Sequence, residues 1–121
     1  MKILIVDDSK AMRMIVKRTL KDAGYGEQPT TEAASGVEGL VALRREAFDV
    51  ILCDWNMPHM NGIDKLHAFR AEKLPGLFGF VTSEGSVETR AQAAAAGAVF
   101  LIAKPFTKED FQAALAMKVA A

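Results

Sequence analysis

The amino-acid sequence predicts an α/β fold, in which a doubly wound parallel sheet of five strands carries five helices on its two faces. Three observations support this class. Short apolar runs alternate with amphipathic stretches along all 121 residues. The apolar runs are continuous, which is typical of strands buried on both faces. The stretches between them are long enough for the helical crossovers that parallel strands require.

In the first half of the chain we expect three strands and two helices. The strands are residues 3–6, a proline-led edge strand at 29–33, and the run from Val50 that ends at Asp54. The first helix runs from about Ser9 to Ala23, is stopped by Gly24, and has an apolar stripe of Met12, Ile15, Val16, Thr19 and Leu20. Ser35 and Glu38 form a capping box for a second helix that ends near Glu46.

In the second half of the chain we expect two further strands and three helices. A helix from Ile63 to about Lys73 precedes a strand at 77–81, which Gly79 is expected to weaken. Ser86 can cap a helix that runs through Ala96 and ends at Gly97. A strand at 99–103 leads to a last helix, capped by Thr107 with Asp110.

Composition limits the class of protein. A chain of 121 residues, half of them hydrophobic, is long enough for one domain with its own core, here residues 1–121. Fifteen basic residues balance fifteen acidic ones, so we expect no direct binding to nucleic acid or membrane. The single cysteine, Cys53, favours the reducing cytoplasm, and the apolar part of MKILIVDDS is too short for a signal peptide.

Polar side chains follow four of the predicted strands. Asp7 and Asp8 follow the first strand, Asp54 the third, Thr82 the fourth and Lys104 the fifth. The carboxyl ends of parallel strands meet at one edge of the sheet, where ligands bind in open α/β folds. Three crowded carboxylates require a proton or a cation, and oxygen ligands favour Mg²⁺. Asp54 is then a candidate nucleophile toward phosphorus, with Lys104 and Thr82 to stabilise the transferred group.

At these residues the sequence resembles the receiver domain of two-component response regulators, of the CheY-like single-domain type. The matching segments are VDDS from Val6, DWNMPHMNG from Asp54, VTSEG from Val81 and KPFT from Lys104. The resemblance covers nearly the whole chain. It implies a flavodoxin-like sheet with the strand order 2-1-3-4-5, and a cis peptide bond between Lys104 and Pro105.

The resemblance also implies a function. Asp54 would accept a phosphoryl group from a sensor histidine kinase, a histidine phosphotransfer protein or a small donor such as acetyl phosphate. Asp8, Asp54 and the backbone carbonyl of Asn56 would bind Mg²⁺ directly, with Asp7 holding it through water. Thr82 and Lys104 would hold the phosphate. The protein would be a cytoplasmic signalling switch, for example in chemotaxis. It would not be an enzyme acting on an external substrate, although it would catalyse its own phosphorylation and dephosphorylation.

Output would pass to a downstream protein through the face formed by the fourth helix, fifth strand and fifth helix. The sequence departs from the family here. Leu101 occupies a position that is usually aromatic in the family, and the neighbouring Phe100 should point to the opposite face of the sheet.

Several alternatives remain open. The chain could be the receiver of a longer regulator, or a receiver-like scaffold that signals without phosphate. A Mg²⁺-dependent phosphatase would need a general acid that Asn56 cannot supply, and a nucleotide- or flavin-binding protein would need a glycine-rich loop after the first strand. Asp7 and Asp8 could instead cap the first helix. Arg13, Lys17 and Arg18 are expected on a solvated helix face, to which a kinase could dock.

Overall fold

The structure is a computed structural model that describes residues 1–55, 62–72, 74, 76–83 and 85–120. Its sheet has five parallel strands in the order β2-β1-β3-β4-β5, as predicted. The strands are β1 (Ile3–Val6), β2 (Thr30–Ala33), β3 (Val50–Cys53), β4 (Leu77–Thr82) and β5 (Phe100–Ala103). The helices are α1 (Lys10–Leu20), α2 (Gly36–Arg45), α3 (Gly62–Ala71), α4 (Val87–Ala96) and α5 (Lys108–Ala120), and a π-helical turn, η1 (Lys21–Tyr25), extends α1.

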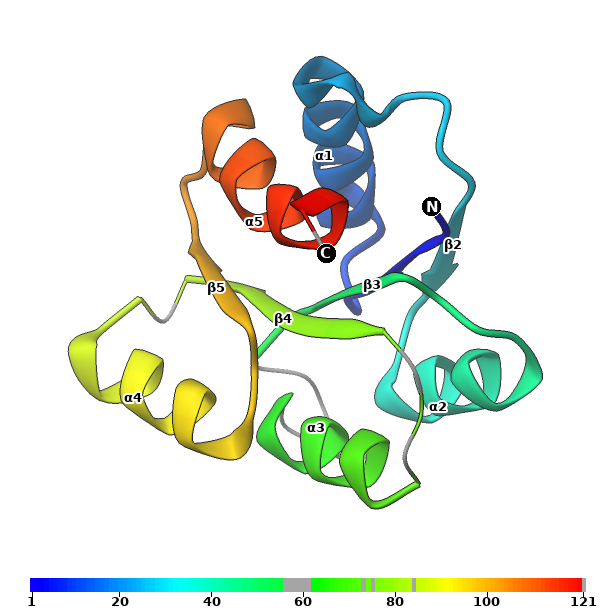
Figure 1. Ribbon diagram of the computed structural model, residues 1–121, viewed down its shortest axis with the longest axis vertical. Coiled ribbons are helices and arrows are strands. Elements are labelled where there is room, and N and C mark those ends of the chain that lie inside the picture. The colour runs from blue at the N-terminus through cyan, green and yellow to red at the C-terminus, as the bar shows by residue number, and fades with distance from the viewer. Residues whose placement is uncertain (56–61, 73, 75, 84, 121) are drawn as a thin grey trace.

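The helices form two layers around the sheet. Helices α1 and α5 lie on one face, and α2, α3 and α4 lie on the other (Figure 1). Each layer has its own apolar core. Ile3 and Ile5 of β1 pack beneath α1 and α5, whereas Leu4 and Val6 pack on the opposite face. All four side chains are buried, which explains why this strand has a continuous apolar sequence.

Most of the predicted helix boundaries are confirmed. The Oγ atoms of Ser35 and Ser86 accept hydrogen bonds from backbone N–H groups three residues further on, at the starts of α2 and α4. Gly97 ends α4 with a φ angle of 103°, in the left-handed region that favours glycine, and Gly24 interrupts the helical backbone within η1 with a φ angle of 101°. None of the helices in the described part of the chain is both long and apolar enough to cross a membrane.

The expectation that Gly79 weakens the fourth strand is wrong. Strand β4 is continuous over six residues, and Gly79 lies opposite Phe100 in the register with β5. A Cβ atom added at Gly79 would lie 2.1 Å from Cε1 of Phe100. The missing side chain therefore makes room for the aromatic ring. The ring covers the glycine and packs with the core beneath α1 and α5.

Two adjacent side chains of β5 point to opposite faces of the sheet, as predicted. Phe100 packs with the core beneath α1 and α5, and Leu101 packs with the core beneath α2, α3 and α4. One member of the predicted apolar stripe of α1 was assigned wrongly, since Ile15 is 47% exposed. Its neighbours Val16 and Leu20 are buried.

Candidate functional site

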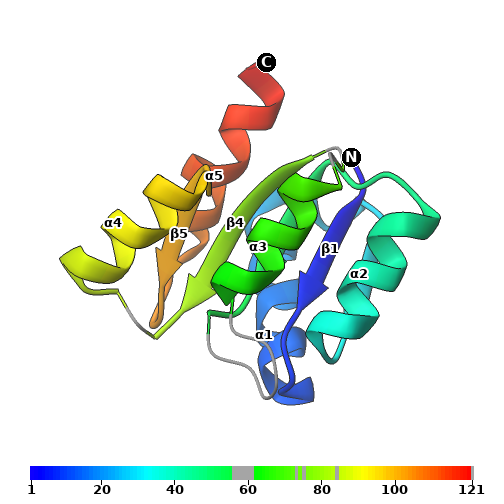
Figure 2. The ribbon, with the colours of Figure 1, turned by 90° about the horizontal axis from the view of Figure 1, so that it is seen from below.

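The candidate site lies at the carboxyl edge of the sheet. The arrowheads of β1, β4 and β5 in Figure 2 point toward the same edge, where the N-terminus of α1 also lies. The register pairs Val6 of β1 with Cys53 of β3, so Asp7 and Asp54 leave the sheet at the same level. Thr82 is likewise paired with Ala103, directly before Lys104. Topology alone thus brings together side chains from four segments of the chain.

Three carboxylates meet at this edge. One carboxylate oxygen from each of Asp7, Asp8 and Asp54 lies within 4.8 Å of the other two. Backbone hydrogen bonds place two of them, because Asp7 N–H donates to the Ala33 carbonyl at 3.0 Å and Asp54 N–H donates to the Val6 carbonyl at 2.9 Å. Asp7 is 5% exposed, Asp54 is intermediate and Asp8 is exposed, so the cluster opens toward solvent on the Asp8 side.

This donor set fits a hard divalent cation. It consists of oxygen atoms, which Mg²⁺ prefers, and it concentrates negative charge that a cation would neutralise. Asn56, whose carbonyl is the further ligand implied by the resemblance, lies outside the described residues. The described part of the site therefore offers three of the four predicted Mg²⁺ ligands.

Lys104 lies between two of the carboxylates. Its Nζ atom is 3.6 Å from Oδ2 of Asp7 and 3.7 Å from Oδ1 of Asp54, which is ion-pair rather than hydrogen-bond distance. Its backbone N–H donates to the carbonyl of Thr82 at 2.8 Å. The peptide bond from Lys104 to Pro105 is cis, as predicted. The ammonium group thus lies where it partly offsets the charge of the acidic cluster.

Thr82 is the last residue of β4 and is fully buried. Its carbonyl accepts the Lys104 N–H, so the ends of β4 and β5 are joined at the site. The structure therefore brings Asp7, Asp8, Asp54 and Lys104 together and places Thr82 on the adjacent strand end.

Arg13 is a site residue that the sequence interpretation missed. The arginine was expected on a solvated face, but its side chain is only 13% exposed. It donates to the main-chain oxygen of Asp7 at 2.6 Å and forms an ion pair with Glu32 at 3.0 Å. The one sequence signal for a site role was the position of Arg13 near the start of the helix, four residues after the capping Ser9. Its partner Glu32 lies 19 residues away in sequence, on the edge strand, and no local pattern connects the two.

Comparison with known proteins agrees with this geometry. The family model of the response regulator receiver domain matches residues 3–116. The chain belongs to this family of two-component signalling proteins. Its sequence is 46% identical over 111 residues to the chemotaxis protein CheY-3 of Vibrio cholerae, covering 88% of this chain and 82% of that protein. It is 44% identical over 113 residues to the chemotaxis protein CheY of Pseudomonas aeruginosa, covering 90% of this chain and 88% of that one.

Solved receiver structures share the fold. The chemotaxis protein CheY4 of Vibrio cholerae superposes on this receiver domain with a TM-score of 0.82 at 35% identity, covering 96% of each chain. A CheY-like receiver domain protein of Methanospirillum hungatei gives a TM-score of 0.85 at 28% identity, covering 98% of this chain and 93% of that one.

Proposed function

We propose that this receiver domain, residues 1–121, is a phosphorylation-activated response regulator with Asp54 as the phosphoacceptor. The donor is a sensor histidine kinase or a histidine phosphotransfer protein, and the reaction depends on Mg²⁺. The convergence of Asp7, Asp8 and Asp54 beside the Lys104 ammonium is the observation that carries the proposal. The similarity to chemotaxis proteins favours chemotaxis as the pathway and the cytoplasm as the compartment.

The reaction is a phosphoryl transfer between two side chains. An oxygen of Asp54 forms a bond to phosphorus while the phosphorus–nitrogen bond of the donor phosphohistidine breaks, and the imidazole leaves with the electron pair. Asp7, Asp8 and Asp54, with the Asn56 carbonyl, would hold Mg²⁺, which would supply positive charge to the transferring group. Lys104 offsets charge on the phosphoryl oxygens, and the Thr82 hydroxyl donates a hydrogen bond to one of them.

An apolar hollow beside Lys104 supports docking of the donor protein. It measures about 430 Å³ and is lined by Met12, Ile15, Lys104, Pro105 and Phe106. Ile15 is 47% exposed, so a partner that covers it would remove apolar surface from water, which gives this misassigned residue a role. A donor helix that lies on α1 in this hollow would bring its phosphohistidine toward the edge of the sheet.

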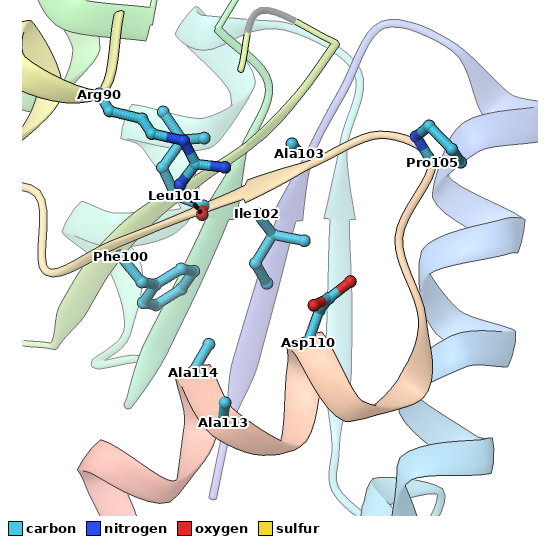
Figure 3. A pocket seen from close by; sticks show the side chains of 9 residues that line it. All are labelled: Arg90, Phe100, Leu101, Ile102, Ala103, Pro105, Asp110, Ala113 and Ala114. Carbon is cyan, nitrogen blue, oxygen red and sulfur yellow. Dashed lines mark hydrogen bonds between the residues drawn. The ribbon is translucent and has the colours of Figure 1, made fainter. Parts of the chain in front are cut away.

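A second hollow supports output through α4, β5 and α5. It measures about 480 Å³, and its floor is formed by β5 from Phe100 to Ala103. Figure 3 shows Arg90 of α4 over one side of the strand, and Asp110 and two alanines of α5 on the other side. A protein partner that binds here would sense any change in the spacing of α4 and α5.

The test uses Trp55, the only tryptophan, which follows Asp54 directly. Its ring packs edge-on against that of Phe80, with 4.9 Å between the ring centroids. Its fluorescence therefore depends on the packing beside the site. We expect a response to Mg²⁺, followed by a Mg²⁺-dependent response to beryllofluoride, a phosphoryl mimic. Asp54→Asn should abolish the second response. Asp49→Asn, which removes a carboxylate at the opposite end of β3, should retain both.

Labelling with acetyl phosphate completes the experiment. Wild-type protein should gain one acid-stable, base-labile phosphoryl group that Asp54→Asn lacks. If wild-type protein shows neither labelling nor a beryllofluoride response, the phosphoacceptor proposal is wrong and the chain is a scaffold that signals without phosphate.

A further inference from the structure

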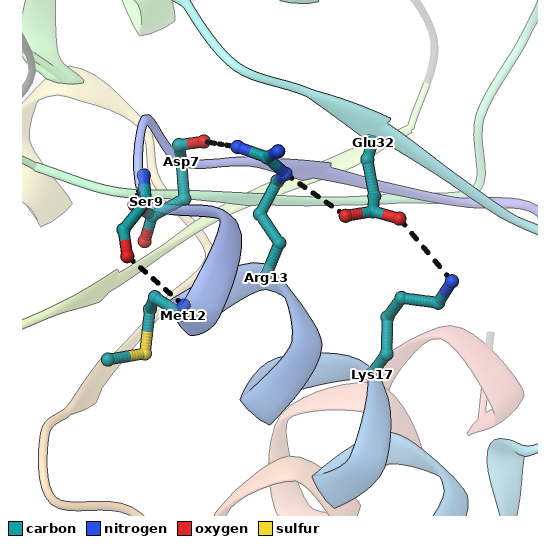
Figure 4. Close-up of polar contacts among 6 residues, drawn as sticks. All are labelled: Asp7, Ser9, Met12, Arg13, Lys17 and Glu32. Atoms are coloured by element: carbon teal, nitrogen blue, oxygen red, sulfur yellow. Dashed lines mark hydrogen bonds and ion pairs between the residues drawn. The ribbon is translucent and has the colours of Figure 1, made fainter.

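A single guanidinium group holds the peptide between Asp7 and Asp8 from outside the acidic cluster. Arg13 of α1 donates from Nη1 to the Asp7 carbonyl at 2.6 Å and from Nε to Oε1 of Glu32 at 3.0 Å. Lys17 lies 3.4 Å from the other Glu32 oxygen. Figure 4 shows the chain of contacts that runs from Asp7 through Arg13 and Glu32 to Lys17. Edge strand β2 is thereby connected to the candidate cation site.

The held carbonyl controls the direction in which the chain leaves the sheet. Asp7 N–H is bound to the Ala33 carbonyl, and Oδ1 of Asp7 accepts the Ser9 N–H at 2.9 Å. The remaining polar group of the Asp7 backbone, its carbonyl, belongs to the planar peptide that leads to Asp8. Rotation of that plane would move the Asp8 carboxylate relative to Asp54. The Arg13 bond opposes this rotation.

We propose that Arg13 is a positioning residue for the Mg²⁺ site. Its planar fork joins the Asp7 carbonyl to Glu32 and so keeps the carboxylates of Asp7 and Asp8 directed toward Asp54. This role rests on the function proposed above, since it presupposes cation binding. A lysine would retain the charge, but it lacks the rigid pair of donors that reaches both partners.

The charge of Arg13 acts in the opposite direction, because a cation near the site repels Mg²⁺. Glu32 offsets that charge at contact distance. Partial burial raises the pKa of the Glu32 carboxyl, but the hydrogen bonds and positive charges of Arg13 and Lys17 lower the pKa by more, so Glu32 is ionised at neutral pH. The two effects predict opposite signs when Arg13 is removed. Loss of repulsion would tighten Mg²⁺ binding, and loss of positioning would weaken it.

The deciding measurement is the Mg²⁺ dissociation constant, followed by Trp55 fluorescence at constant ionic strength. We expect Arg13→Ala and Arg13→Lys each to weaken binding by about tenfold, the lower end for residues that orient metal ligands. Arg18→Ala removes the same charge from the same helix and should change binding by less than about twofold, because an exposed charge is screened. Unchanged or tighter binding by Arg13→Lys or Arg13→Ala overturns the proposal.

A second variant tests the connection to Glu32. Glu32→Gln should weaken binding in the wild-type background and have no additional effect in Arg13→Ala, because Glu32 acts through the arginine. Equal effects in both backgrounds would contradict the proposed chain of contacts.

A metal-free measurement separates positioning from general destabilisation. The amide ¹H and ¹⁵N shifts of Asp8 should change in Arg13→Lys without Mg²⁺, and they should stay constant in Arg18→Ala. Wild-type protein that fails to bind Mg²⁺ overturns this proposal together with the Mg²⁺ dependence of the proposed function. Wild-type binding with unaltered Arg13 variants overturns the role of Arg13 alone.

Discussion

Two helices that begin at the carboxyl edge are attached to the molecule in different ways. Helix α1 buries Val16 and Leu20 in the core that it shares with α5, and its Arg13 bonds to Asp7, directly after β1, and to β2. Helix α4 buries Ala93, the first of a run of four alanines that ends the helix. Its arginine, Arg90, is exposed and donates to two backbone carbonyls at 3.2 and 3.3 Å.

The difference indicates which side of the site can move. Bulky buried side chains and short polar contacts fix the α1 side, which carries Asp7 and Asp8. Small side chains bury little apolar area, so we expect the α4 side, which follows Thr82, to have the lower free energy of local opening. We expect a phosphoryl group on Asp54 to leave α1 in place and to shift α4, which borders the hollow proposed for output.

The largest effect should come from the core beneath α1. Leu20 is 1% exposed, and Leu20→Ala should lower the free energy of unfolding by about 2–5 kcal/mol. The matched change in α4, Ala93→Gly, should cost about 1 kcal/mol, mainly through lost helix propensity. Urea unfolding measures both. Equal losses would remove the contrast between the two helices.

The difference in attachment between α1 and α4 should not extend to the strands beneath them. Substitution of Gly79 in β4 tests whether the strands are rigid. Gly79→Ala would force a methyl group against the Phe100 ring, at a cost of about 1–3 kcal/mol. The double variant with Phe100→Ala should lose less stability than the sum of the single changes, since the clash disappears. If the losses of unfolding free energy add, β4 and β5 move apart to accept the methyl group and are no more rigid than α4.

The polar attachment of α4 predicts a smaller effect. Arg90→Ala removes the bonds to the Gly85 and Leu101 carbonyls and should cost about 0.5 kcal/mol, as expected for exposed hydrogen bonds. Native-state hydrogen exchange should accelerate in α4 and stay constant in α1. Equal acceleration in both helices would mean that Arg90 stabilises the whole domain rather than this segment.

The polar attachment of α1 predicts the smallest effect, which depends on pH. The hydrogen bonds and charges of Arg13 and Lys17 hold the folded pKa of Glu32 below its ordinary value, so its ionised form stabilises the fold above that ordinary value. This contribution is lost as pH falls through the folded pKa. Wild-type stability should therefore decline more steeply than that of Glu32→Gln as pH falls below the ordinary pKa of a glutamate, as measured by unfolding at a series of pH values. Parallel curves would show that Glu32 contributes no pH-dependent stability.

The sequence predicted the fold because its signals are local. Continuous apolar runs indicated the strands, and Ser35, Ser86, Gly24 and Gly97 marked helix ends through interactions within a few residues. The candidate site could be predicted as well, because parallel topology requires the residues after the strands to meet. The chemistry of the residues already favoured Mg²⁺ and a nucleophilic Asp54, and the resemblance added the role of each ligand, while helix capping by Asp7 and Asp8 stayed open as an alternative.

The remaining errors concern contacts between distant segments. Arg13 resembles any basic residue on a helix face, and its burial depends on Glu32 approaching from the edge strand. Gly79 resembles a weak point in a strand until Phe100 is seen to fill the space beside it. Ile15 continues an apolar stripe, but the helix is rotated so that this side chain faces solvent. No local sequence pattern predicts the surroundings of these three residues.

The packing of Phe100 against Gly79 also constrains how relatives of this receiver domain can diverge. We expect a lineage that acquires a side chain at position 79 to replace the ring at position 100 with something smaller first, because the reverse order passes through an overpacked intermediate that costs about 1–3 kcal/mol. Reversion is equally ordered, since the glycine must return before the ring does. The two positions are therefore expected to change together in relatives that share this packing.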